Sequence, residues 1–71
     1  MNIKSPLVSV AILTYNSSKF IAEAINSALE QDYPNFEIVI SDDASTDNTI
    51  DIISGYAKNY PDKIKVLINE I

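Results

Sequence analysis

The sequence predicts an α/β fold, a partial Rossmann-like β-α-β-α-β unit with a three-stranded parallel sheet in the order 3-2-1. Three short apolar runs, at 7–14, 37–41 and 64–68, alternate with two segments of helical periodicity. The runs begin roughly 28 residues apart, a spacing that suits right-handed crossovers between parallel strands. The strand order follows if each crossover moves one place in the same direction.

The three apolar runs differ in character. Residues 7–14 are rich in β-branched side chains and nearly continuous, which predicts a strand that is covered on both faces. Residues 37–41 form the second predicted strand and residues 64–68 the third. Lys65 lies within the third run and indicates one less covered face.

The first predicted helix follows Ser17 or Ser18, because a short hydroxyl can accept a hydrogen bond from the free amides of the first turn. We expect it to end before Pro34, since the residue that precedes a proline resists the helical conformation. One apolar stripe recurs at helical spacing and comprises Phe20, Ile21, Ala24, Ile25, Ala28 and Leu29.

The second predicted helix starts near Asp47, whose charge suits the positive end of the helix dipole. Ser45 and Thr46 are the candidate caps. Gly55 lies inside this helix and weakens it by about 1 kcal/mol relative to alanine. The predicted buried stripe comprises Ile50, Ile53, Tyr56 and Ala57.

Length and composition predict one small globular domain over residues 1–71, with 46% hydrophobic and 21% charged residues. The chain has no Cys and no His, which excludes disulfides, thiolate catalysis, zinc sites of the Cys/His type and an imidazole base. A net charge of -5 argues against a nucleic-acid partner. The apolar runs are too short to span a membrane and the start lacks a signal-peptide pattern, so we expect a cytoplasmic protein.

The candidate site lies where the first two strands end. Thr14, Tyr15 and Asn16 follow one strand, and Asp42 and Asp43 follow the next. Because the carboxyl ends of parallel strands meet at one edge, these groups form a plausible nucleotide-sized crevice. A carboxylate can accept the N3–H of uracil, an aromatic ring can pack on a base or sugar, and helix amino termini favour phosphate.

Each of these residues also has a purely structural interpretation. Asp42 is as well suited to tying down its loop or capping the next helix, whereas for Asp43 a functional role is favoured, because strand-end sites concentrate function. Tyr15 could pack against its loop and Asn16 could serve a turn. Gly55 is the only glycine, so phosphate-binding glycine loops are absent. A receiver-type domain carries its acidic pair after the first strand, not the second.

The motifs together resemble the amino terminus of a family 2 inverting glycosyltransferase with the A-type fold. They are Thr-Tyr-Asn at 14–16, Gln-x-Tyr-Pro-x-Phe-Glu at 31–37 and Asp-Asp-x-Ser-x-Asp at 42–47. The resemblance runs from about residue 6 to residue 68. It is specific because of the combination and spacing of the motifs, since no single piece would suffice.

The resemblance implies roles for the candidate residues. Thr14, Tyr15 and Asn16 match the loop of the family's nucleotide subsite, and Asp43 matches the carboxylate that meets the uracil edge. Asp42 then holds the loop. A carboxylate disfavours CDP donors, because cytosine has no N3 proton, but it leaves UDP and GDP as alternatives.

Two positions depart from the family pattern. Leu13 stands where the family often has proline, and Ala44 where it often has glycine. We expect Ala44 to avoid a positive φ, which glycine would adopt freely.

The resemblance also implies parts without a counterpart here: an Asp-x-Asp motif that binds Mg²⁺ or Mn²⁺, a catalytic base and an acceptor pocket. We therefore interpret the chain as a fragment with no catalytic and no metal-binding residue, inactive alone. The full enzyme would transfer a sugar from a UDP-sugar or similar donor to an acceptor hydroxyl with inversion, in cell-surface polysaccharide biosynthesis. The alternative is a non-catalytic α/β module that self-associates through the exposed edge of its first strand.

Overall fold

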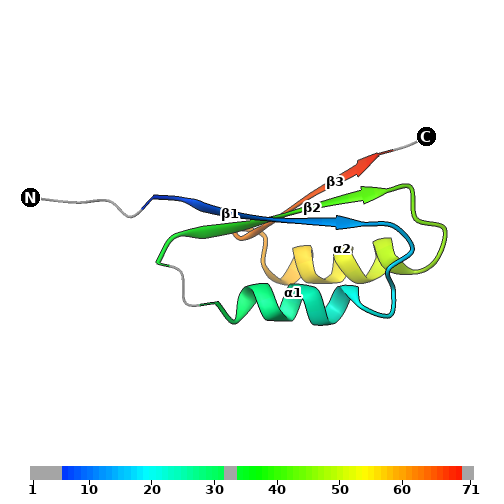
Figure 1. Ribbon diagram of the computed structural model, residues 1–71, viewed down its shortest axis with the longest axis horizontal. Coiled ribbons are helices and arrows are strands. Elements are labelled where there is room, and N and C mark those ends of the chain that lie inside the picture. Colours follow the sequence, from blue (N-terminus) through cyan, green and yellow to red (C-terminus); the bar gives the residue numbers. More distant parts are fainter. Residues whose placement is uncertain (1–5, 32–33, 70–71) are drawn as a thin grey trace, which may run out of the picture.

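The computed structural model describes residues 6–31 and 34–69, which form the predicted β-α-β-α-β arrangement (Figure 1). Both strand pairs are parallel, and β2 lies between β1 and β3. The fold class and the strand order predicted from the sequence are therefore confirmed. The elements are β1 (Val8–Thr14), α1 (Ile21–Leu29), β2 (Phe36–Asp43), α2 (Thr49–Asn59) and β3 (Ile64–Asn69).

Both helices cover the same face of the sheet, and the other face is open (Figure 1). Two crossovers of one handedness that move in the same direction carry their helices to the same side. Along β1, Val10 and Ile12 are half-buried under the helices, whereas Ser9, Ala11 and Leu13 are exposed. The expectation that the first strand is covered on both faces is therefore wrong for the residues described.

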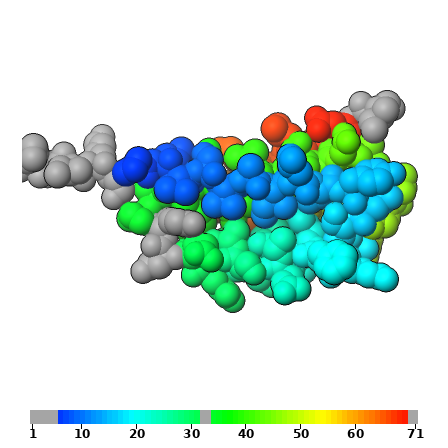
Figure 2. Space-filling model, in the orientation of Figure 1, coloured from blue at the N-terminus to red at the C-terminus, as the bar shows by residue number. Residues whose placement is uncertain are grey.

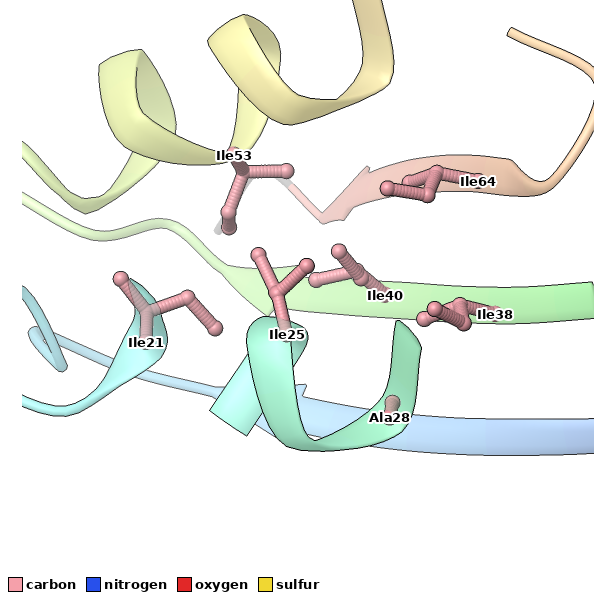
Figure 3. Close-up of a cluster of buried hydrophobic side chains, with 7 residues drawn as sticks. All are labelled: Ile21, Ile25, Ala28, Ile38, Ile40, Ile53 and Ile64. Atoms are coloured by element: carbon pink, nitrogen blue, oxygen red, sulfur yellow. The ribbon is translucent and has the colours of Figure 1, made fainter. Parts of the chain in front are cut away.

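The core lies between β2 and the two helices (Figure 3). Ile38 and Ile40 of the central strand are fully buried because they point toward the helices, at alternate positions of the strand. Burying one isoleucine contributes roughly 1.5–3 kcal/mol, so this layer fixes both helices to the sheet. The complete buried set is Ile21, Ile25, Ala28, Ile38, Ile40, Ile53 and Ile64.

The start of α1 differs from the prediction. The helix begins at Ile21, and neither Ser17 nor Ser18 caps it through its side chain. The Ser17 hydroxyl instead donates to the carbonyl of Tyr15, and the Ser17 carbonyl accepts the amides of Phe20 and Ile21 at 2.9 and 2.8 Å. A turn therefore delays the helix, and Phe20 is 69% exposed outside the apolar stripe.

The second helix begins two residues later than predicted, at Thr49, and neither Ser45 nor Thr46 caps it. Asp47 precedes the N-cap residue Asn48, and its Oδ1 accepts the Thr49 amide two residues later at 2.9 Å, as in an Asx turn. The predicted stripe is confirmed in part: Ile53 is buried and the half-buried Tyr56 and Ala57 pack against the core, but Ile52 packs there in place of Ile50. At the end of α1, Asp32 and Tyr33 lie outside the described residues.

The second strand extends beyond the predicted end at residue 41. β2 includes both acidic residues, with Asp42 opposite Thr14 of β1 and Asp43 opposite Asn69 of β3. Successive strand residues point to opposite faces of a sheet. The two neighbouring carboxylates therefore leave the sheet in opposite directions. Within the described residues, no helix has the length and apolarity needed to cross a bilayer.

Candidate functional site

Asp42 points toward the helices and is fully buried. Its Oδ1 accepts hydrogen bonds from the hydroxyls of Thr14 and Ser45, both at 2.5 Å, and its Oδ2 accepts the Ser45 amide at 2.9 Å. Hydrogen bonds to an ionised carboxylate are roughly twice as strong as neutral ones. The carboxylate therefore joins the end of β1 to the loop after β2, which is a loop-holding function.

Hydrogen bonding keeps Asp42 ionised despite its burial. Burial alone would raise the pKa of the carboxyl, because it penalises the charged form. The hydrogen bonds from the Ser45 hydroxyl, the Thr14 hydroxyl and the Ser45 amide outweigh this penalty and bring the pKa below its ordinary value. The loop-holding anion is thus charged at neutral pH.

Asp43 points the other way, onto the open face of the sheet, and is exposed. It borders a pocket of about 360 Å³ at the carboxyl ends of the strands, the right-hand end of Figure 1. The structure therefore brings Asp43 together with Thr14 and Tyr15, as predicted, and separates it from Asp42. The lining residues are Leu13, Thr14, Tyr15, Ser41, Asp43 and Asn69.

Asn16 does not line this pocket but links the two loops. Its φ of 46° lies in the left-handed region, which asparagine tolerates better than most residues. In this conformation its Oδ1 accepts the amides of Thr46 at 2.8 Å and Asp47 at 3.3 Å. The side chain of Asn16 thus lies at the start of α2 and orders the loop before that helix.

Two parallel relays complete the link between the loops, whose residues pack together at the right-hand end of Figure 2. The backbone amide of Asn16 donates to the Ser45 hydroxyl at 2.9 Å, and that hydroxyl donates to Asp42. Likewise the Ser17 amide donates to the Thr49 hydroxyl at 2.9 Å, and that hydroxyl donates to Asp47. Each relay runs from an amide of one loop through a hydroxyl to a carboxylate.

These contacts alter the expectation that the helix amino termini favour phosphate. At the start of α2 the amides of Thr46, Asp47 and Thr49 already donate to side chains of this chain. Donation from Thr49 and Ser18 also lowers the pKa of Asp47 to about 2, so a negative charge already stands there. The start of α2 is therefore poorly suited to a phosphate. The pocket beside Asp43 is better suited to a neutral polar group.

Ala44 adopts a φ of 53°, so the expectation that it avoids a positive φ is wrong. The chain must turn immediately after β2 for the Ser45 amide to reach back to Asp42. The left-handed conformation makes that turn, at a cost of about 1–2 kcal/mol for a residue with a Cβ. The hydrogen bonds to Asp42 hold Ala44 in this conformation.

Ser41 and Asn69 are pocket residues that the sequence analysis did not single out. The Nδ2 group of Asn69 donates to Oγ of Ser41 at 3.1 Å, which joins the ends of β2 and β3. The position of Asn69 in the sequence could have indicated a pocket residue, because Asn69 directly follows the third predicted strand just as Asp42 follows the second.

No three His, Cys, Asp or Glu side chains within residues 6–31 and 34–69 are grouped so that they could hold a metal ion. The acidic side chains near the pocket do not make such a set. The Asp42 carboxylate already accepts hydrogen bonds from the two loops, and Asp43 faces the other side of the sheet. The residues described thus do not fit a divalent cation.

Comparison with known proteins gives a consistent result. Residues 9–71 match the family Glycosyl transferase family 2. An uncharacterized glycosyltransferase of Rickettsia prowazekii is 48% identical over 69 residues, covering 97% of this chain and 20% of that protein. The poly(ribitol-phosphate) beta-N-acetylglucosaminyltransferase TarS of Staphylococcus aureus is 44% identical over 61 residues, covering 83% and 11%. The chondroitin synthase of Escherichia coli is 45% identical over 56 residues, covering 79% and 8%. The chain thus spans a fifth or less of these three relatives.

Proposed function

This chain belongs to glycosyl transferase family 2, and we propose that it forms the nucleotide-binding part of an enzyme that transfers a sugar from a nucleotide-sugar donor. The observation that carries the proposal is the pocket in which the exposed Asp43 lies beside Tyr15. A carboxylate acceptor and an aromatic ring are the groups that a nucleobase needs for edge recognition and stacking. The relatives TarS, a poly(ribitol-phosphate) beta-N-acetylglucosaminyltransferase, and chondroitin synthase support sugar transfer in polymer biosynthesis.

In the proposed complex Asp43 accepts the ring N–H of uracil, and the Tyr15 ring packs against the base or the ribose. Thr14 borders the same pocket, and its hydroxyl donates to Asp42. This hydrogen bond holds the Thr14 part of the pocket wall in place. Asn16 and Asp42 hold the two loops in place without contacting the donor. Such fixed loops reduce the conformational entropy that binding must otherwise overcome.

Transfer itself requires more than this pocket. Inverting displacement at the anomeric carbon needs a base for the acceptor hydroxyl and compensation for the charge of the leaving diphosphate. We propose that residues outside the described part supply both, the second through Mg²⁺ or Mn²⁺, which would stabilise the leaving diphosphate. The described residues then bind the donor and do not catalyse transfer by themselves.

The test is a titration of the full-length protein with UDP, with and without Mn²⁺, followed by calorimetry. Asp43→Asn removes the carboxylate acceptor and should weaken UDP binding about tenfold or more. Asp51→Asn is the matched control, because Asp51 is an exposed aspartate in the first turn of α2 and loses the same charge. Equal UDP affinity in the two variants would contradict the nucleotide site.

A second proposal concerns the edge of the sheet. β1 pairs with β2 along one side and is an outer strand of the sheet that the structure describes. Its seven residues include no charged residue and no proline, the features that usually protect an edge from pairing. We propose that the isolated chain self-associates through β1.

Sedimentation over a range of concentrations measures this association. Ala11→Lys places a charge on the exposed side of β1 and should shift the chain toward monomer. Ser54→Lys, on the exposed side of α2, is the matched control and should leave association unchanged. A folded monomer at all concentrations of the unmodified chain would exclude the edge contact.

A further inference from the structure

Asn69 stands beside Asp43 at the pocket. The two residues are register partners on neighbouring parallel strands, β3 and β2. Register partners lie roughly 4.8 Å apart, and their side chains leave the sheet on the same face. Both border the pocket of about 360 Å³. The pocket therefore presents an amide and a carboxylate side by side.

The orientation of the Asn69 amide is set by Ser41. Nδ2 of Asn69 donates to Oγ of Ser41 at 3.1 Å, and Ser41 lies two residues before Asp43 on the same face of β2. A side-chain amide carries two N–H hydrogens. One is held by Ser41, and the second has no acceptor among the residues that the structure describes. A donor is thus available next to the Asp43 acceptor.

The Asp43 acceptor beside the Asn69 donor is complementary to a nucleobase edge that presents a ring N–H beside a carbonyl oxygen. In uracil the ring N3–H is flanked by carbonyl oxygens, so a carboxylate can accept the N–H while an amide donates to the adjacent oxygen. We propose that Asn69 is a specificity-determining residue that donates to the carbonyl oxygen next to the ring N–H bound by Asp43. This inference rests on the proposed function.

The same pair of groups rejects the opposite edge. Cytosine presents a ring nitrogen lone pair where uracil has N3–H, and an amino group where uracil has O4. Both contacts would then place acceptor against acceptor and donor against donor, which leaves these polar groups unpaired once the bound base excludes water from them. Guanine offers N1–H beside O6 and fits the pair, whereas adenine offers the cytosine-like pattern. Asn69 and Asp43 together select bases with a ring N–H beside a carbonyl.

The affinity ratio of UDP to CDP, measured by calorimetry on the full-length protein, tests the role of Asn69. Asn69→Asp replaces the donor by an acceptor of the same shape and should lower this ratio about tenfold. The added charge also repels the diphosphate, but UDP and CDP carry the same diphosphate, so the ratio cancels that effect. Leu67→Asp is the control, because Leu67 is exposed on the same strand, two residues away, and does not border the pocket.

A donor–acceptor exchange gives the sharper readout. The double variant Asp43→Asn with Asn69→Asp keeps the net charge and reverses the two groups, so it should bind CDP more tightly than UDP. A ratio that Asn69→Asp leaves unchanged, or a double variant that still prefers UDP, would overturn the role of Asn69 while UDP binding by the unmodified protein upholds the proposed function. Failure of the unmodified protein to bind UDP would overturn both.

Discussion

Replacing Ala44 by glycine should stabilise the protein. Ala44 has a φ of 53°, a conformation that costs a residue with a Cβ about 1–2 kcal/mol and glycine almost nothing. Glycine in turn raises the entropy of the unfolded chain, which costs about 0.4–1 kcal/mol. The difference predicts that Ala44→Gly raises the free energy of unfolding by about 0.5–1 kcal/mol.

Urea denaturation measures this change. For a small domain with a slope of about 1 kcal/mol per molar urea, the midpoint should rise by about 0.5–1 M at an unchanged slope. Ala44→Val should lower the midpoint, because a β-branched residue is a genuine outlier at positive φ. The two substitutions at one position thus bracket the wild type from opposite sides.

A matched control distinguishes the backbone effect from a general effect of glycine. Ala22 lies inside α1, where Ala→Gly should destabilise the protein by about 1 kcal/mol. Opposite signs at Ala44 and Ala22 are expected. A midpoint that falls in Ala44→Gly as it does in Ala22→Gly would refute the strain at Ala44.

Three further predictions concern stability. Asp42→Asn should lower the free energy of unfolding by about 2 kcal/mol, because buried hydroxyl and amide donors lose a charged acceptor, whereas Asp43→Asn should change it by less than about 0.5 kcal/mol in the same urea experiment. Acidification should destabilise the fold. The pKa of Asp47 is lowered from 3.8 to about 2, and that of Asp42 is also lowered. Their contribution to the free energy of unfolding is therefore complete above about pH 5 and is lost as the pH falls toward 2. Thermal unfolding from pH 6 to pH 2 checks this, and Asp47→Asn should show a shallower loss. Gly55→Ala should raise the free energy of unfolding by about 1 kcal/mol, because an added Cβ meets no atom within 4 Å, and an unchanged urea midpoint would contradict it.

The elements of the fold were predictable because their signals are local. Alternation of apolar runs with helical periodicity gave the order of strands and helices, and the short spacing gave parallel crossovers. The end of β2 was missed because the apolar run stops at Ile40, whereas backbone pairing continues through Asp42 and Asp43. Strand pairing depends on main-chain groups, so a polar side chain does not end it.

The details of the loops were not predictable because their partners are distant in sequence. Ser17 was expected to cap α1, but its amide bonds to Thr49, 32 residues away, and its hydroxyl turns back to Tyr15. Likewise Thr46 donates to Asn16 instead of capping α2. Local propensity identifies residues with short polar side chains, and the fold decides which of several acceptors and donors each one meets.

The hydrophobic core decides which carboxylate reaches the pocket. Ile38 and Ile40 must face the helices, so by alternation Asp42 must face them too and Asp43 must face away. A shift of β2 by one residue would exchange the two carboxylates and also expose both isoleucines, at a cost of roughly 3–6 kcal/mol. The burial of two isoleucines thus determines which of the two carboxylates borders the pocket, although neither isoleucine borders it.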